Sequence, residues 1–176
     1  KIYLFDTTLR DGAQTQGVNF SIGDKVKISK SLSALGVDYI EAGWPGANPL
    51  DTSFFNSQPD TNKSTLVAFG MTKKQGRSAD NDPGLASLLN ANTNSVCVVG
   101  KTWDYHVDIV LKISKEENLE NIKETAKHFV ERNKEFMFDA EHFFDGYKSN
   151  KDYAISCIKT AYENGARWIV LCDTNG

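Results

Sequence analysis

Short apolar runs recur along the chain, and longer polar stretches with scattered apolar residues separate them. Six runs are rich in Val, Ile, Leu, Phe and Cys and hold few turn residues, which is typical of buried strands. The predicted strands are Ile2–Asp6, Asp38–Ala42, Thr65–Gly70, Ser95–Gly100, Phe136–Glu141 and Trp168–Asp173.

Three of the stretches between these runs carry helix signals. Ser21 to Asp24 resembles a capping box that opens a helix, and Gly36 provides its stop. A second helix is predicted from about Leu119 to Asn133. Ser149 to Asp152 opens a third helix with the same capping chemistry, and Gly165 ends it. The apolar side chains expected to form their buried faces are Ile22, Val26, Leu32 and Leu35, then Ile122, Ala126, Phe129 and Val130, and finally Ile155, Ile158 and Tyr162.

The strands and helices alternate throughout, with no stretch of hairpins. This order predicts an α/β fold with a parallel sheet, either a doubly wound open sheet or a (β/α)8 barrel. The turn after the first strand has no GxGxxG, and polar residues gather at the carboxyl ends of several strands, where a barrel holds its active site. A barrel needs about 250 residues and eight strands. We therefore expect residues 1–176 to be an incomplete TIM-barrel catalytic domain that lacks two units, part of a longer protein with no second domain in this chain.

Acidic residues collect at the carboxyl ends of the predicted strands. In the fifth strand Met137, Asp139 and Glu141 share one face, which would point into the barrel, while Phe136, Phe138 and Ala140 would meet the helices. Crowded like charges are costly unless a cation compensates them. Arg10 is one candidate, and a divalent Mg, Mn or Zn ion is the other. The acidic set is Asp6, Asp11, Glu41, Asp139, Glu141 and Asp173.

Composition narrows the function classes. The formal net charge of -3 and 40% hydrophobic content suit a globular domain that does not bind nucleic acid. The basic cluster Lys73, Lys74 and Arg77 is predicted to be a solvated loop. No apolar run approaches the roughly 18 residues of a membrane span, so no membrane partner is expected. Cys97, Cys157 and Cys172 lie in apolar runs without CxxC spacing, which indicates buried thiols in a cytoplasmic protein and makes the glycosylation pattern at Asn62 incidental.

The stretch from Asp6 to Gln14, Asp-Thr-Thr-Leu-Arg-Asp-Gly-Ala-Gln, resembles the N-terminal motif of the DRE-TIM metallolyase superfamily. That group includes 2-isopropylmalate, homocitrate and citramalate synthases and hydroxymethylglutaryl-CoA lyase. Later landmarks follow in order at Tyr39–Gly46, Asp139–Tyr147 and Leu171–Gly176, so the resemblance covers the whole chain. Gly43–Pro49 and Gly100–Asp104, with His106, are most similar to the long citramalate synthase branch.

The resemblance implies a metal-dependent acyltransferase that condenses acetyl-CoA with a 2-keto acid. For the citramalate branch the keto acid is pyruvate and the products are (R)-citramalate and CoA, on a route to isoleucine and leucine. It also implies a homodimer and a metal held partly by a His-x-His pair on a seventh strand. His106, His128 and His142 do not have that spacing, so the histidine ligands are expected beyond Gly176.

The resemblance also assigns roles to seven positions. Asp11 is the candidate metal ligand, and its alternative is a loop or helix-capping carboxylate. Arg10 would stabilise the oxygen on which negative charge develops, and its alternative is a structural ion pair. Glu141 would serve catalysis, with a pairing role toward Arg10 as its alternative. The candidate substrate-binding residues are Thr174, Gln14, Glu41 and His106.

Several residues near these positions keep simpler interpretations. Thr174 is also a candidate helix cap, and His106 could equally lie at the exposed start of a helix. His142 and His128 are expected to be structural. Aromatic side chains at Trp44, Trp103 and Tyr147 either shape a pocket for a small keto acid or simply pack.

Two other functions remain open from the sequence. A carbon–carbon lyase of the same superfamily would share these residues, and 2-isopropylmalate or homocitrate synthesis would differ only in the keto acid. A non-catalytic barrel is disfavoured because Arg10, Asp11, Glu141 and Thr174 are present together.

Overall fold

Six strands alternate with helices in the computed structural model, which describes residues 1–61 and 63–176. The glycosylation pattern at Asn62 lies outside the described residues. The strands follow the order β1-β2-β3-β4-β5-β6 in one sheet, and the pairs β1–β2, β2–β3 and β5–β6 are parallel. The predicted alternation of strands and helices around a parallel sheet is confirmed. The strands are β1 Phe5–Asp6, β2 Tyr39–Gly43, β3 Thr65–Met71, β4 Ser95–Lys101, β5 Glu135–Glu141 and β6 Trp168–Leu171.

Five strands agree with their predicted ranges to within two residues, but β1 is much shorter than predicted. Ile2 and Leu4 are exposed instead of buried, and pairing begins only where Phe5 meets Tyr39. The Leu4 N–H donates to the carboxylate of Asp38 at 2.9 Å, while the Leu4 carbonyl still accepts the Tyr39 N–H at 3.0 Å. A polar side chain therefore replaces the main-chain partner of this one N–H at the start of the sheet.

The chain divides into two compact units. The first comprises Lys1–Gly70 and Ser87–Val96, and the second comprises Met71–Ala86 and Cys97–Gly176. The first unit holds the 3-10 turn η1 (Gly12–Gln14), α1 (Ile22–Leu35) and α2 (Pro49–Asn56), and α3 (Pro83–Asn90) runs across the division. The second unit holds η2 (Ala79–Asn81), α4 (Asp104–His106), the π-helix η3 (Val107–Leu111), α5 (Lys115–Val130), α6 (Phe143–Ser149) and α7 (Lys151–Glu163).

Helix α1 begins and ends as predicted, but it buries a different face. Its capping box at Ser21 is present, and Gly36 closes it in the left-handed conformation at φ 94°. The buried residues are Lys25, Ser29 and Ser33, whereas Leu35 is 80% exposed. The predicted apolar stripe is therefore wrong. Lys25 donates to Asp51 and Ser33 accepts the Lys63 N–H, both outside the helix, while Ser29 donates to a carbonyl of its own helix. Ile22, at the other end of that stripe, is also exposed.

Helix α5 buries Ile122, Ala126 and Phe129 as predicted, while Val130 is exposed. The ring of Phe129 stacks on Phe136 of β5 at 6.0 Å, which confirms that Phe136 faces a helix.

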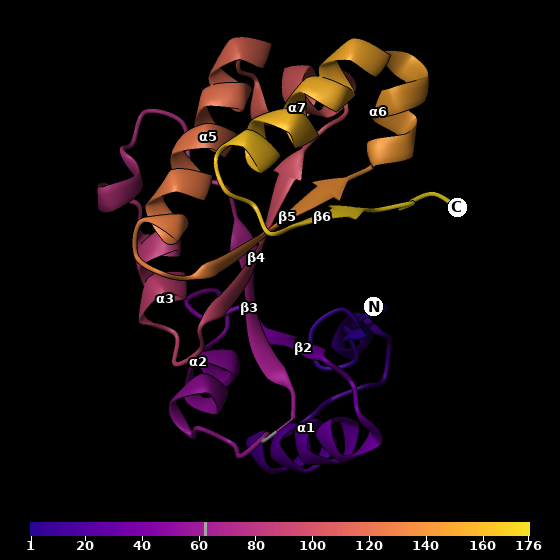
Figure 1. The fold of residues 1–176 in the computed structure, drawn as a ribbon, viewed down its shortest axis with the longest axis vertical. Coiled ribbons are helices and arrows are strands. Elements are labelled where there is room, and N and C mark those ends of the chain that lie inside the picture. Colours follow the sequence, from indigo (N-terminus) through magenta and orange to yellow (C-terminus); the bar gives the residue numbers. More distant parts are fainter. Residues whose placement is uncertain (62) are drawn as a thin grey trace. The chain divides into compact units, whose positions relative to one another are not determined.

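Helix α7 lies beside α5 in the second unit and departs from its prediction twice (Figure 1). Its cap is Asn150, whose side chain accepts the Tyr153 N–H, because α6 continues to Ser149. Its buried face carries Tyr153, Ala154, Cys157 and Ala161. The predicted stripe is largely outward, with Ile155 and Tyr162 exposed.

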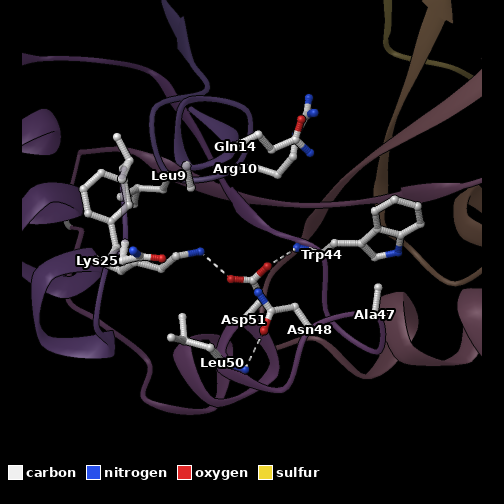
Figure 2. Close-up of a pocket in the computed structure, with 13 residues that line it drawn as sticks. Leu9, Arg10, Gln14, Lys25, Trp44, Ala47, Asn48, Leu50 and Asp51 are labelled. Atoms are coloured by element: carbon white, nitrogen blue, oxygen red, sulfur yellow. Dashed lines mark hydrogen bonds and ion pairs between the residues drawn. The ribbon is translucent and has the colours of Figure 1, made fainter. Parts of the chain in front are cut away.

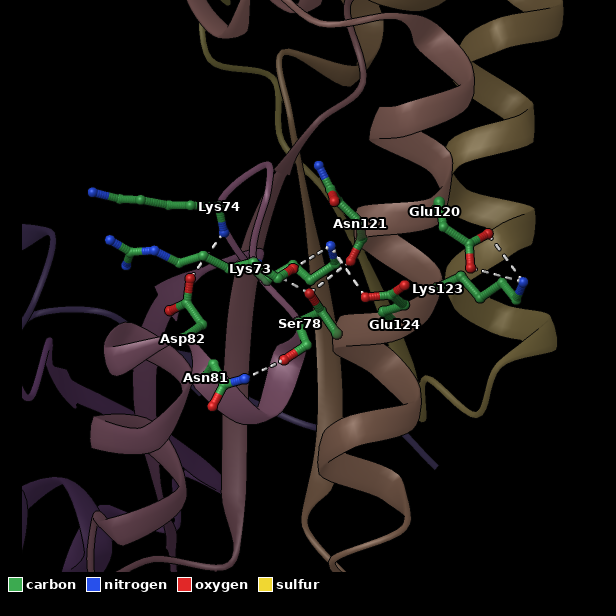
Figure 3. Close-up of polar contacts among 11 residues, drawn as sticks. Lys73, Lys74, Ser78, Asn81, Asp82, Glu120, Asn121, Lys123 and Glu124 are labelled. Atoms are coloured by element: carbon green, nitrogen blue, oxygen red, sulfur yellow. Dashed lines mark hydrogen bonds and ion pairs between the residues drawn. The ribbon is translucent and has the colours of Figure 1, made fainter.

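The basic cluster after β3 lies in a loop with Lys74 and Arg77 exposed, as predicted, but Lys73 is buried and pairs with Glu124 (Figure 3). The Lys73 N–H donates to Thr125 on α5, and its ammonium pairs with Glu124 at 3.1 Å and donates to the Arg77 carbonyl. Its neighbour Lys74 donates its N–H to Asp82. The prediction is wrong for Lys73 because its partners lie on α5, more than 50 residues away in the chain.

Two of the three cysteines meet the prediction of buried thiols. Cys97 and Cys157 are buried, and burial raises the pKa of the Cys157 thiol to about 12. Cys172 is only partly buried and its Sγ lies 2.9 Å from the Asp139 carboxylate, so the prediction is wrong for this residue. Among the described residues, no helix combines the length and apolar character that crossing a membrane requires.

Candidate functional site

The motif that opens the chain folds into a tight turn after β1. The Asp6 carboxylate accepts hydrogen bonds from the Thr8 N–H and hydroxyl, each at 3.0 Å. The Thr7 carbonyl accepts from the N–H groups of Arg10 and Gly12, each at 3.1 Å. Asp6 therefore holds loop backbone, and the turn fixes where Arg10 begins.

The guanidinium of Arg10 is held between a buried carboxylate and an aromatic ring. Its Nε and Nη2 both lie 2.6 Å from Oε2 of Glu41, a side chain only 1% exposed. Its Cζ lies 3.8 Å from the ring centre of Phe69. The Trp44 indole meets the same ring edge-on at 5.4 Å. A buried glutamate needs such a partner, and the cation gains a fixed orientation in return.

Asp11 stands apart from this buried pair. Its side chain is 62% exposed, and its carboxylate reaches Arg10 Nη1 at 3.3 Å. Within residues 1–61 and 63–176, no group of three or more His, Cys, Asp or Glu side chains is arranged to hold a metal ion. One carboxylate does not make a divalent-metal site, so the residues present do not by themselves fit the metal that the sequence implies.

A pocket of about 330 Å³ opens beside Arg10 and Gln14 in the first unit (Figure 2). Trp44 and Asn48, from the segment after β2, form another part of its wall. Its lining residues are Leu9, Arg10, Ala13, Gln14, Val18, Asn19, Phe20, Lys25, Trp44, Ala47, Asn48, Leu50 and Asp51.

The pocket wall rests on a buried ion pair. The Lys25 ammonium pairs with the Asp51 carboxylate and donates to the Ala42 carbonyl at 2.8 Å. The other Asp51 oxygen accepts the Trp44 N–H at 2.8 Å. Gly43 adopts φ 151°, and a side chain there would collide with the Asp51 carboxylate. The pair therefore fixes the backbone that carries Trp44.

In the second unit, Glu141 at the end of β5 is anchored through both its side chain and its main chain. Its Oε2 pairs with the ammonium of Lys101, the last residue of β4. Its carbonyl accepts the Thr102 hydroxyl at 2.7 Å. The carboxyl ends of β4 and β5 are thus joined at the residue expected to be catalytic.

Aromatic rings and histidines gather next to this pair. The His106 ring lies 4.7 Å from both Trp103 and His142. Burial, followed by the charges of Lys101 and His142, lowers the pKa of His106 below its usual 6.5. His106 therefore favours the neutral form, and its Nδ1 has no hydrogen-bond partner among the described residues.

Thr174 contacts the backbone of the β5 end. Its hydroxyl accepts the His142 N–H at 3.1 Å, and His142 adopts φ 51°. The His142 ring lies 2.9 Å from Asp145, and that hydrogen bond lowers the pKa of Asp145. The structural role expected for His142 agrees with these contacts. His128 is likewise buried, with its Nδ1 3.2 Å from Asp80.

Each unit therefore gathers part of the predicted set. The first brings Arg10, Asp11 and Glu41 into contact, with Gln14 on the pocket beside Arg10. The second brings His106, Glu141 and Thr174 to the ends of neighbouring strands, through the contacts described above.

Sequence reasoning missed Lys101 and the Lys25–Asp51 pair. Lys101 could have been found, since it follows directly after a predicted strand whose neighbour ends at Glu141. No local pattern marks Lys25 and Asp51, which lie 26 residues apart.

The fold and these strand-end residues define a class of protein, and comparison with known families agrees. The HMGL-like family model matches residues 1–176, so the chain belongs to the HMGL-like family. Within it, the chain is 48% identical to the (R)-citramalate synthase of Aquifex aeolicus (strain VF5), over 100% of this chain and 34% of that protein. It is 35% identical to 2-isopropylmalate synthase 1 of Caldanaerobacter subterraneus subsp. tengcongensis, over 100% of this chain and 43% of that protein. The chain thus spans about a third of the length of its citramalate synthase relatives.

The solved structures confirm the fold class. The HMG-CoA lyase of Bacillus subtilis superposes with a TM-score of 0.79 at 20% identity, covering 100% of this chain and 59% of that chain. The six parallel strands are therefore part of a TIM barrel of this type. At this level of identity the likeness concerns the fold and not the reaction.

Proposed function

We propose that the protein carrying this chain condenses acetyl-CoA with pyruvate to give (R)-citramalate and CoA, and that residues 1–176 supply part of one catalytic barrel. The observation that carries the proposal is the 48% identity to an (R)-citramalate synthase over the whole chain, against 35% to a 2-isopropylmalate synthase. The same proposal includes a cytoplasmic homodimer acting in branched-chain amino-acid synthesis.

The proposed chemistry needs a base and a cation. Glu141, as a carboxylate, takes a proton from the acetyl methyl group, and the resulting carbanion attacks the ketone carbon of pyruvate. The electrons of the C=O bond move to oxygen, where Arg10 stabilises the negative charge. The alkoxide then takes up a proton to become the hydroxyl group, and Glu141 gives its proton back to solvent. Water hydrolyses the thioester and releases CoA. The pairing of Glu141 with Lys101 and the fixed orientation of Arg10 on Phe69 support these assignments.

The remaining assignments follow the same resemblance. Thr174, Gln14, Glu41 and His106 are proposed to contribute to the keto-acid site, and Asp11 to bind a divalent Mg, Mn or Zn ion. Because the described residues do not complete a metal site, no step of the proposal is routed through the ion.

The test is a CoA-release assay on the complete gene product that carries this chain. Pyruvate, 2-oxoisovalerate and 2-oxoglutarate are offered in parallel, with acetyl-CoA and divalent metal present. We expect pyruvate to give the highest kcat/KM. Preference for 2-oxoisovalerate would reassign the protein to 2-isopropylmalate synthesis, and cleavage of a hydroxyacyl-CoA without condensation would make it a lyase.

A matched pair of variants tests the role of Arg10. Arg10→Lys keeps the charge but loses the paired contact to Glu41, and we expect kcat to fall by about 100-fold. Arg167→Lys is the control, because Arg167 also lies over an aromatic ring, that of Trp168 at 4.9 Å. Equal activity of the two variants would remove Arg10 from the reaction.

A further inference from the structure

We propose that Lys101 is a positioning residue that holds the Glu141 carboxylate correctly aimed for proton transfer. The inference rests on the proposed function, because it gives a partner to the base of that reaction. Lys101 lies outside the set expected from the sequence, and it emerges only from the contact between the ends of β4 and β5.

In the contact between Lys101 and Glu141, the lysine side chain is less exposed to solvent than the glutamate side chain. The Lys101 side chain is 15% exposed and that of Glu141 is 29% exposed. The ammonium donates a hydrogen bond to Oε2 of Glu141 and has no other hydrogen-bond partner among the described residues. Partial shelter strengthens the attraction, because the local dielectric is lower than that of water, while the remaining exposure leaves the carboxylate reachable by a substrate.

The main chain of Lys101 is held in place by contacts with α5 and α7. Its carbonyl accepts the Asn118 amide of α5 at 2.9 Å and contacts Cys157 Sγ of α7 at 3.8 Å. The same Asn118 amide donates to the Tyr153 hydroxyl at 2.8 Å. These buried contacts fix the main chain of Lys101, so the lysine reaches Glu141 from an anchored base.

Glu141 is fixed on the other side by its main chain. The Thr102 hydroxyl donates to the Glu141 carbonyl, so Thr102 and Lys101, the last residue of β4, secure the backbone and the side chain of the glutamate. A base that must approach a C–H bond depends strongly on orientation, and a displacement of about 1 Å can cost roughly 100-fold in rate.

The first experiment measures the contact independently of activity. A double-mutant cycle in urea unfolding uses Lys101→Met, Glu141→Gln and the double variant. We expect the two residues to be coupled by at least about fivefold in the unfolding equilibrium constant. The matched control is the exposed pair Lys123–Glu120 on α5, whose Lys123→Met and Glu120→Gln cycle should give about twofold or less (Figure 3).

The second experiment measures the consequence for catalysis in the complete gene product. We expect Lys101→Met to lower kcat by about 30- to 100-fold while KM for pyruvate stays within about threefold, since the lysine acts on the base and not on substrate binding. Lys101→Arg, which retains the charge, should recover at least a tenth of the wild-type kcat. Lys123→Met should leave both constants unchanged.

The outcomes separate the proposal from the function on which it rests. A wild-type protein that releases no CoA with any of the keto acids overturns the proposed function and this role with it, even where the coupling is found. An active wild type with no coupling between Lys101 and Glu141 overturns the contact. Coupling together with an unchanged kcat in Lys101→Met makes the pair purely structural and overturns the positioning role.

Discussion

The buried pair Lys25–Asp51 allows a quantitative prediction about the first unit. The two side chains are 4% and 8% exposed, and each makes one further hydrogen bond, to the Ala42 carbonyl and from the Trp44 N–H. Replacing Lys25 with Met removes the cation and leaves a buried carboxylate with one donor. Breaking a buried pair in this way costs roughly 3–5 kcal/mol, because the remaining charge is uncompensated.

The double variant shows whether that cost comes from the orphaned charge. Lys25→Met with Asp51→Leu removes both charges and leaves two main-chain groups, of Ala42 and Trp44, without partners. Each such group costs roughly 1–3 kcal/mol. We therefore expect the double variant to be less destabilised than the sum of the single variants by at least about 2 kcal/mol.

The assay is urea unfolding followed by the fluorescence of Trp44, in a background where Trp103 and Trp168 are replaced by Phe. Trp44 then reports on the unit that contains the pair. Lys30→Met is the control, because Lys30 is exposed on the same helix and should change stability by no more than about 0.5 kcal/mol. If Lys25→Met costs no more than Lys30→Met, the buried pair does not stabilise the pocket wall.

Two further predictions concern the second unit and use unfolding free energies. Gly146→Ala places a methyl group 2.5 Å from the Thr102 carbonyl, so it should destabilise the protein by about 1–3 kcal/mol despite the better helix propensity of Ala. The control is Gly23→Ala in α1, where the added methyl group meets nothing closer than 3.7 Å and the change should be neutral or stabilising. A gain in stability from Gly146→Ala would contradict the close approach. His106 has a pKa lowered by burial, so the unfolded state takes up its proton first as pH falls through 6.5. Stability should therefore fall from pH 7.5 to 5.5, and His106→Gln should reduce that fall; an equally steep fall in the variant would show that His106 does not contribute.

Much of the fold followed from local chemistry in the sequence. The capping box at Ser21 and the stop at Gly36 predicted the ends of α1, and apolar runs located five strands closely. The motif from Asp6 to Gln14 indicated the family through its resemblance to a known sequence. In the structure Asp6 accepts hydrogen bonds from Thr8, and the Thr7 carbonyl accepts them from the N–H groups of Arg10 and Gly12.

Tertiary structure alone decided which faces of α1 and α7 are buried, whereas the buried face of α5 followed largely from the sequence. On α1 the buried residues are polar because Lys25 meets Asp51, and on α7 a one-residue change of cap accompanies a buried face centred on Tyr153 and Cys157. Lys73 is buried for a similar reason, with Glu124 and Thr125 as partners. The pattern of apolar residues along one helix cannot predict these partners, because they lie in other segments of the chain.

For the candidate site, too, the sequence determined some features and the tertiary structure decided others. The sequence by itself determined which residue types stand near the strand ends, since Arg10 and Asp11 follow an apolar run and Glu141 ends one. Glu41 lies one residue before the end of its predicted run. Only the tertiary structure decided their partners, which are Glu41 for Arg10 and Lys101 for Glu141. The physical reason is that an ion pair depends on distance in space, and these partners are 31 and 40 residues apart in the chain.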